Sequence, residues 1–184
     1  MLQQQRALDH VRACSSSSRL PERSRRCDRT RSAASIERGA QGLYRPKLDI
    51  ATARFVSSEI ADEAYFKPPV TPPRAGDVIV DVGANAGLFA LDCSRRVGRH
   101  GMVIAMEPQP AAFLALERNA ATASSSRNIV PIRCAIGSAA GEGTIHSYRF
   151  ATGWGTLHPS ERSVRDDGES RITPPQHRLP ILTR

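Results

Sequence analysis

The chain has 184 residues and a formal net charge of +8, with 40% hydrophobic but only 5% aromatic residues. This length favours a single domain, and the 13 glycines and 13 prolines argue against a large core along the whole chain. No apolar stretch resembles a signal peptide or a membrane span, so we expect a cytoplasmic protein that has no membrane partner.

The positive charge is concentrated in the first part of the chain. Residues 1–47 hold 11 Lys/Arg and 4 Asp/Glu, whereas residues 48–184 hold 15 and 14. This first part is rich in Ser and Arg but has neither interleaved aromatic residues nor a nucleic-acid-binding module, which predicts a disordered basic tail and no nucleic-acid partner. Its acidic residues disfavour the alternative of an organelle transit peptide. We expect a tail at 1–47, a folded domain at 48–158 and an irregular polar segment at 159–184.

Strands and helices alternate in the expected domain. In chain order they are a helix or strand near 54–60, a strand at 77–80, a helix from 88, a strand at 102–106, a helix from 110, a strand at 129–133 and a hairpin strand at 144–150. Phe113, Leu114 and Leu116 should form the inward face of the second helix. Pro131 lacks a backbone N–H and therefore predicts a sheet edge or an irregular strand. The alternation predicts an α/β fold with a parallel sheet.

The turn after the first strand of this unit carries the most informative motif. It reads Val80-Asp-Val-Gly-Ala-Asn-Ala-Gly-Leu-Phe89, and its glycines Gly83 and Gly87 allow a ligand to approach the backbone. A strand that turns directly into a helix presents backbone N–H groups and the positive helix end to a ligand. Glu107 ends the next strand, 20 residues after Gly87, where an acid can bind both ribose hydroxyls. The alternative is that Glu107 only caps the helix near Pro110.

The details of the motif distinguish between two nucleotide-like cofactors. A dinucleotide motif requires G-x-G-x-x-G, but here Asn85 occupies the second glycine position and Leu88 the third. Asp81, at the strand end, would repel a pyrophosphate but suits the ammonium group of an amino acid. S-adenosylmethionine therefore fits better than NAD, and an NAD-dependent dehydrogenase stays as a weaker alternative.

Asp81-Val-Gly-Ala-Asn-Ala-Gly-Leu-Phe89, followed by Ala105-Met-Glu-Pro108, resembles the FkbM-type S-adenosylmethionine-dependent methyltransferases. The resemblance covers about residues 57–158, with weaker similarity at 113–119, 135–138, 141–143 and 154–157. It implies a Rossmann-like class I methyltransferase fold and O-methylation of a hydroxyl on a small molecule or sugar.

The resemblance also implies the residues that bind the cofactor. Asp81, Gly83, Asn85 and Gly87 would line the methionine and ribose part of the site, and Glu107 would hold the ribose diol. Members of the family continue with a K-I-D-V-E-G-like strand, but nothing after Trp154 resembles it. We therefore expect an incomplete parallel sheet, the first half of such a domain. A non-catalytic remnant of this kind stays as the alternative to an active enzyme.

The four cysteines lie far apart in the sequence and form no C-x-x-C pair. Cys14, Cys27, Cys93 and Cys134 therefore do not predict a metal site. Cys93, in the first helix after the glycines, and Cys134, just after a strand, should be reduced and buried as small hydrophobic residues.

Four histidines are each isolated from any acid that could act as a catalytic partner. We therefore assign surface or structural roles to His100, His146, His158 and His177. A general base is required only when the methyl acceptor is a poorly acidic hydroxyl, and the sequence offers no residue that can be named as this base. The oligomeric state has no sequence signal.

Overall fold

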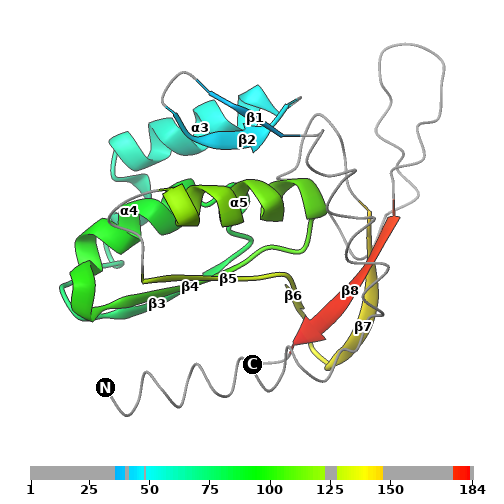
Figure 1. Ribbon diagram of the computed structural model, residues 1–184. Coiled ribbons are helices and arrows are strands. Elements are labelled where there is room, and N and C mark those ends of the chain that lie inside the picture. The colour runs from blue at the N-terminus through cyan, green and yellow to red at the C-terminus, as the bar shows by residue number, and fades with distance from the viewer. Residues whose placement is uncertain (1–35, 40–41, 48, 123–127, 147–175, 183–184) are drawn as a thin grey trace.

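The computed structural model describes residues 36–39, 42–47, 49–122, 128–146 and 176–182. Figure 1 shows the order of their helices and strands, including two short 3-10 helices, η1 and η2. The elements are β1 Ile36–Arg38, β2 Tyr44–Pro46, α3 Ile50–Ala61, η1 Ala64–Phe66, β3 Val78–Val82, α4 Leu88–Val97, η2 Gly98–His100, β4 Met102–Met106, α5 Pro110–Thr122, β5 Ile129–Ile132, β6 Ala135–Ile136, β7 Gly141–His146 and β8 Gln176–Leu182.

A three-stranded parallel sheet forms the centre of the fold. Its strand order is β3-β4-β5, with Val78 opposite Met102 and Val103 opposite Ile129. All five residues of β4 are buried, which explains the unbroken apolar sequence of this strand. The predicted α/β, Rossmann-like fold is confirmed. Pro131 lies in β5 at the edge of this sheet, as predicted.

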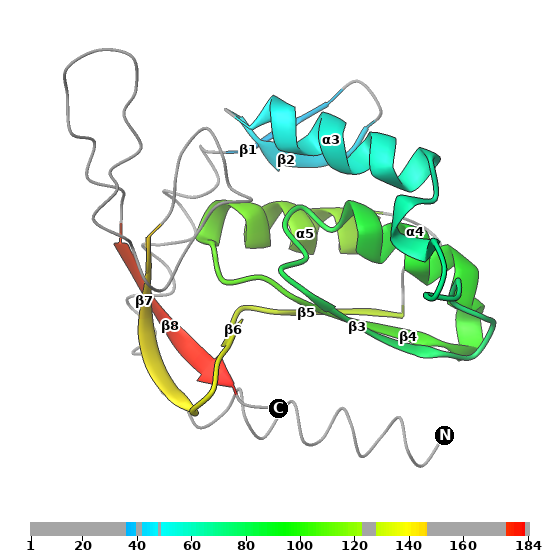
Figure 2. The same cartoon turned by 180° about the vertical axis from the view of Figure 1, so that it is seen from behind.

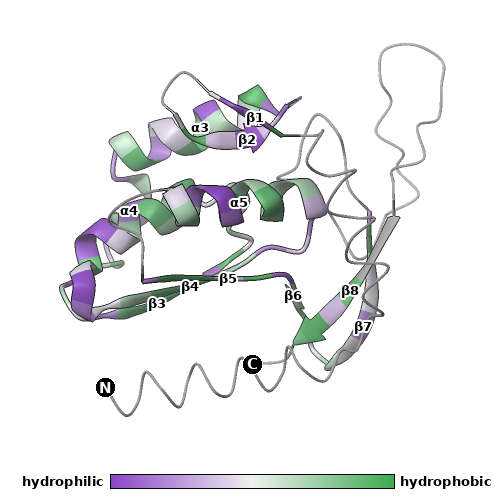
Figure 3. Cartoon of the chain, in the orientation of Figure 1, coloured by the Kyte–Doolittle hydropathy of each residue, from purple (hydrophilic) through white to green (hydrophobic). Residues whose placement is uncertain are grey.

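Helices α4 and α5 pack on one face of this sheet, and both connect parallel strands (Figures 1 and 2). On the far side of α5 lie α3 and the β1–β2 hairpin, so this part of the molecule has three layers. Colouring by hydropathy shows that apolar residues gather along β3, β4 and β5 and on the facing helices (Figure 3). Helix α4 begins six residues after the last residue of β3, Val82, so its first turn lies close to the carboxyl end of this strand.

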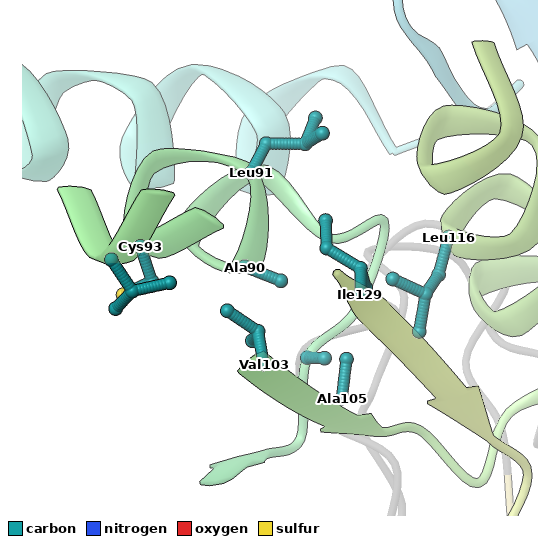
Figure 4. Close-up of a cluster of buried hydrophobic side chains, with 9 residues drawn as sticks. Ala90, Leu91, Cys93, Val103, Ala105, Leu116 and Ile129 are labelled. Carbon is teal, nitrogen blue, oxygen red and sulfur yellow. The ribbon is translucent and has the colours of Figure 1, made fainter. Parts of the chain in front are cut away.

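Small side chains allow α4 and α5 to lie close to the sheet. In the main core cluster, Val103, Ala105 and Ile129 of the strands face the helices (Figure 4). Ala90 of α4 and Leu116 of α5 fill the space above them. Packing of this kind excludes water and provides most of the stability of such a small unit.

The buried face of α5 agrees with the predicted one in part, because Leu116 is buried and Phe113 and Leu114 pack against core clusters. Its buried non-proline residues are Ala112, Ala115, Leu116 and Asn119. Their helical spacing puts them on one face, whereas Phe113 and Leu114 are only half-buried beside it. The largest apolar side chains of α5 were expected on this face, but small alanines occupy much of it, because the helix packs closely against the neighbouring elements.

The opposite face of the sheet is apolar and bears no described helix. Val78, Val80 and Val82 of β3 point to this face, and Val80 is 55% exposed. Along β4 and β5, the same face is buried in a second cluster that includes Met102, Ile104, Met106, Ile132 and Cys134. The described strands β3, β4 and β5 agree with the expected parallel sheet.

The predicted end of the N-terminal tail at residue 47 needs correction. Residues 36–46 contain the antiparallel β1–β2 hairpin, in which Ile36 pairs with Pro46. Ile36 is buried against Ala86 and Ala115, so the hairpin is part of the folded unit. The tail prediction for residues 1–35 lies outside the described residues.

The predicted irregular segment at 159–184 also needs correction. Residues 176–182 form β8, which pairs antiparallel with β7 and parallel with β6. Leu179 of β8 is buried with Ala135 and Ile145, and this small core explains the strand. Strand β7 begins at Gly141, earlier than the predicted 144, and residues 147–175 lie outside the described part of the chain.

Among the described residues, no helix is both long and apolar enough to cross a membrane.

Candidate functional site

A pocket of about 260 Å³ lies at the carboxyl end of β3. Ligands of open α/β sheets bind at this end of the strands, where a strand turns into the following helix. The strand, the glycine turn and the start of α4 form one wall, and α3 with η1 forms the other. The lining residues are Thr52, Ala53, Val56, Tyr65, Asp81, Val82, Gly83, Ala84, Asn85, Ala86, Leu88 and Phe89.

The turn between β3 and α4 bends through three residues with positive φ. Gly83 and Gly87 have φ of +81°, and Asn85 has φ of +51°. The N–H groups of Gly83 and Ala84 both donate to the carbonyl of Met106 at 2.9 Å, which ties the turn to the end of β4. This conformation favours glycine, and asparagine is one of the few other residues that adopt it readily.

The two glycines have different surroundings. A Cβ added to Gly83 would meet no atom within 4 Å, so this residue leaves open space beside the pocket. A Cβ added to Gly87 would lie 2.4 Å from Cδ1 of Leu116, and Gly87 is not part of the pocket lining. Gly83 thus lies where a ligand can approach, whereas Gly87 lets the start of α4 pack on α5.

Asp81 brings a carboxylate to the pocket wall. Its Oδ2 is buried and has no hydrogen-bond partner among the described residues. Burial raises the pKa of Asp81 to about 6. A buried carboxylate oxygen that has no partner is costly, and a cationic or hydrogen-bond-donating ligand would remove this cost.

Glu107 lies behind the glycine turn and is only 3% exposed. Its Oε2 accepts a hydrogen bond from the N–H of Asn85 at 2.9 Å, and its Oε1 accepts one from the N–H of Gln109 at 2.7 Å. Burial raises the pKa of Glu107 to about 7, although the two hydrogen bonds act in the opposite direction. Glu107 is not part of the pocket lining, and it joins the turn to the residue before α5. A role in binding ribose stays a prediction.

Helix α3 contributes residues that the sequence analysis missed. Thr52, Ala53 and Val56 line the pocket opposite the glycine turn. The sequence contains a signal for this helix, because Asp49 is its N-cap and accepts a hydrogen bond from the N–H of Thr52 at 3.2 Å. None of the residues of α3 is fully buried, so its apolar pattern is weak.

Tyr65 of η1 is a further pocket residue without a sequence signal. Its ring centroid lies 4.6 Å from that of Phe89, which also lines the pocket. The Tyr65 hydroxyl donates to Oε2 of Glu59 at 2.7 Å, which connects η1 to α3. Two aromatic rings from different parts of the chain therefore meet at the pocket wall.

Arg96 of α4 holds η1 in place. It donates through Nε to Asp92 at 2.7 Å and forms an ion pair with Glu63 at 3.2 Å. Its guanidinium also lies 4.7 Å from the ring centroid of Phe66. The wall formed by α3 and η1 is thereby connected to the helix that begins at the glycine turn.

Asn119 connects the glycine turn to the N-terminal hairpin and is completely buried. Its Oδ1 accepts from the N–H of Tyr44 at 2.7 Å. Its Nδ2 donates to the carbonyls of Tyr44 and Ala86, both at 2.8 Å. The side-chain amide therefore pairs with β2 as a neighbouring strand would, and it also fixes the last part of the turn.

We expect Asn119→Ala to lower the free energy of unfolding by about 1–3 kcal/mol, because the half-buried backbone groups of Tyr44 and the buried carbonyl of Ala86 lose their partner. Urea denaturation of both proteins measures this change. Thr122→Ala is the matched control on the same helix, since the Thr122 hydroxyl bonds only to nearby carbonyls of α5. Equal stability of N119A and the wild type would contradict the structural role of this amide.

The other polar candidates do not gather into a site. Cys93 and Cys134 are buried, as predicted, and burial raises the pKa of Cys93 to about 12. His100 is exposed and His146 half-buried, whereas the side chains of His158 and His177 lie outside the described residues. Within the described ranges, no group of three or more His, Cys, Asp or Glu side chains could hold a metal ion.

Comparison with known proteins identifies two related methyltransferases. The methyltransferase sdnD of Sordaria araneosa is 30% identical over 111 residues, which cover 60% of this chain and 42% of sdnD. The 31-O-demethyl-FK506 methyltransferase FkbM of Streptomyces tacrolimicus is 35% identical over 121 residues, which cover 65% of this chain and 45% of that protein. No family model matches the chain.

The chain thus spans less than half the length of the curated relatives that it matches. Over the matched region, the resemblance to FkbM-type methyltransferases is confirmed.

Proposed function

We propose that the pocket at the end of β3 binds S-adenosylmethionine and that the protein transfers its methyl group to a hydroxyl of a small molecule or sugar. The observation that supports this most is the buried Oδ2 of Asp81, which has no partner among the described residues. The similarity to two methyltransferases supports the reaction class. The 31-O-demethyl substrate in the name of the Streptomyces relative supports an oxygen acceptor.

The residues of the pocket fit this cofactor. Asp81 would accept hydrogen bonds from the ammonium group of the methionine part. This group would give the carboxylate a positively charged hydrogen-bond partner. Gly83 and Asn85 would lie along the methionine and ribose part, where the open space at Gly83 admits a ligand next to the backbone. Glu107 would hold the ribose diol from behind the turn, and Gly87 would act through the position of α4.

The size of the pocket fits one end of an extended ligand. Its volume of about 260 Å³ is slightly below the roughly 300–1,000 Å³ of sites that enclose whole small molecules. S-adenosylmethionine would therefore extend beyond the described lining. When bound, it supplies an activated methyl group, and the contribution of this chain is to hold and orient the donor.

Calorimetric titration with S-adenosylmethionine and with NAD tests this proposal. Binding of S-adenosylmethionine in preference to NAD is the expected result. A folded sample that binds neither ligand would overturn the proposal, and preferential binding of NAD would support a dehydrogenase instead. Binding without methyl transfer to any of a panel of hydroxyl acceptors would favour a non-catalytic remnant.

Asp81→Asn should weaken S-adenosylmethionine binding about 10- to 100-fold, because a hydrogen bond to a charged group is worth roughly 1.5–3 kcal/mol. Wild-type affinity should also fall as the pH drops below about 6, where Asp81 becomes protonated, whereas D81N should lose the part of this dependence that Asp81 causes. Titration calorimetry at pH 5, 6 and 7.5 measures both effects. Asp77→Asn is the matched control, since Asp77 bonds to the N–H of Arg74 just before β3. Wild-type affinity in D81N would refute the role of Asp81.

A further inference from the structure

Tyr65 contributes an aromatic ring to the pocket that the glycine motif does not include. Its ring packs on Phe89, and Phe89 in turn lies 5.7 Å from Phe66 between ring centroids. Of these three rings, Tyr65 and Phe89 line the pocket together with Asp81. The pocket therefore has an aromatic wall and a carboxylate within one small volume.

The surroundings of the Tyr65 ring are negative. Its hydroxyl donates to the Glu59 carboxylate, and burial, Glu59 and Asp81 all raise the pKa of Tyr65 above its ordinary value. A phenol that donates to a carboxylate has a more electron-rich ring, and the face of an aromatic ring attracts cations. The lining residues include no Lys or Arg. Arg96 is engaged with Asp92, Glu63 and the ring of Phe66.

These features favour a ligand with positive charge over a neutral ligand of the same shape. The proposed donor and its demethylated product form such a pair, because the sulfur of S-adenosylmethionine is a cationic sulfonium and that of S-adenosylhomocysteine is a neutral thioether. Both molecules carry the same ammonium group, ribose and adenine. Contacts of Asp81 or Gly83 with these shared groups therefore do not distinguish the two molecules directly.

We propose that Tyr65 is a specificity-determining residue, whose ring makes the pocket bind the sulfonium form in preference to the thioether form. This inference rests on the proposed function, since it concerns the same cofactor. Cation–π interactions correspond to a preference of about 2- to 30-fold. Such a preference helps S-adenosylhomocysteine to dissociate after the reaction, so that a new molecule of S-adenosylmethionine can bind.

The test is the ratio of two dissociation constants, measured by titration calorimetry with S-adenosylmethionine and S-adenosylhomocysteine. The wild type should prefer the sulfonium about 2- to 30-fold, Tyr65→Leu should bring the ratio close to one, and Tyr65→Phe should keep most of the preference. A general loss of structure would weaken the binding of both ligands and leave the ratio of their dissociation constants unchanged. Glu59→Gln is a second variant that keeps the ring in place, and its preference should be reduced by a smaller factor.

Two results would overturn the inference in distinguishable ways. If the wild type binds both ligands, and folded samples of Y65L and E59Q show the same ratio as the wild type, Tyr65 does not determine specificity, but the proposed function stands. If the folded wild type binds neither ligand, the proposed function itself fails and this inference fails with it.

Discussion

Gly87→Ala is expected to lower the free energy of unfolding by about 2–5 kcal/mol. The positive φ of Gly87 costs an alanine about 1–2 kcal/mol. The new methyl group would also meet Cδ1 of Leu116 at 2.4 Å, and overpacking of this kind costs about 1–3 kcal/mol. Leu116 is almost completely buried, so its side chain would have to shift within the packed core to admit this methyl group. Urea or thermal denaturation measures the loss.

Two other glycines serve as matched controls for this prediction. Gly76 and Gly83 also have positive φ, but an added Cβ would meet no atom within 4 Å at either position. Gly76→Ala and Gly83→Ala should therefore show only the backbone cost, and Gly87→Ala should be the least stable of the three. Equal losses in all three variants would show that contact with Leu116 contributes nothing.

The second large effect concerns the ionisation of Glu107. Its pKa is raised from 4.5 to about 7, so the folded protein binds a proton more tightly than the unfolded chain does. Between about pH 4.5 and 7, the folded state therefore holds more protons than the unfolded state, and its stability should fall as the pH rises. A shift of this size corresponds to about 3 kcal/mol. Asp81 acts in the same direction at lower pH.

Comparison with Glu107→Gln separates this contribution from those of all other ionisable groups. In E107Q, the amide NH2 of the glutamine faces one of the two backbone N–H groups that Glu107 binds. The resulting loss of stability is the same at every pH, because glutamine does not ionise. The stability of the wild type relative to E107Q should be highest near pH 4.5 and should decrease by about 3 kcal/mol up to pH 7.5. Urea denaturation of both proteins across this range measures the difference. A difference that is constant or rises with pH would contradict the buried, ionisable role of Glu107.

The features that could be predicted from the sequence are those with a local signal. The β-branched run before the glycines predicts a parallel strand, and the glycines predict the turn into α4, because both depend on residues close in sequence. The run also predicts that this strand is buried, which is wrong, because Val78, Val80 and Val82 lie on an exposed face of the sheet. Pro131 predicts a sheet edge for the same reason, since the missing N–H is a property of the residue itself. For Asp81, the motif predicts a position beside the ligand site, and the structure places it in the pocket lining.

The features that were missed depend on residues far apart in the sequence. Gly87 meets Leu116 only after α4 and α5 pack together, so the motif alone suggests an approach for a ligand. Asn119 looks like an ordinary polar residue of a helix until β2 reaches it from 75 positions away. Tyr65 follows a helix with no fully buried residue, and its position in the pocket depends on contacts with Phe89 and Glu59.

The three hydrogen bonds of the Asn119 side chain also determine which parts of the protein can open separately. The β1–β2 hairpin cannot leave the body of the protein by local unfolding unless the amide releases Tyr44, and this amide also holds the carbonyl of Ala86. A molecule that binds only when the glycine turn is intact therefore stabilises the hairpin by mass action, although it touches no residue there. Ligand binding in the pocket should therefore slow proteolysis and amide exchange in the β1–β2 hairpin.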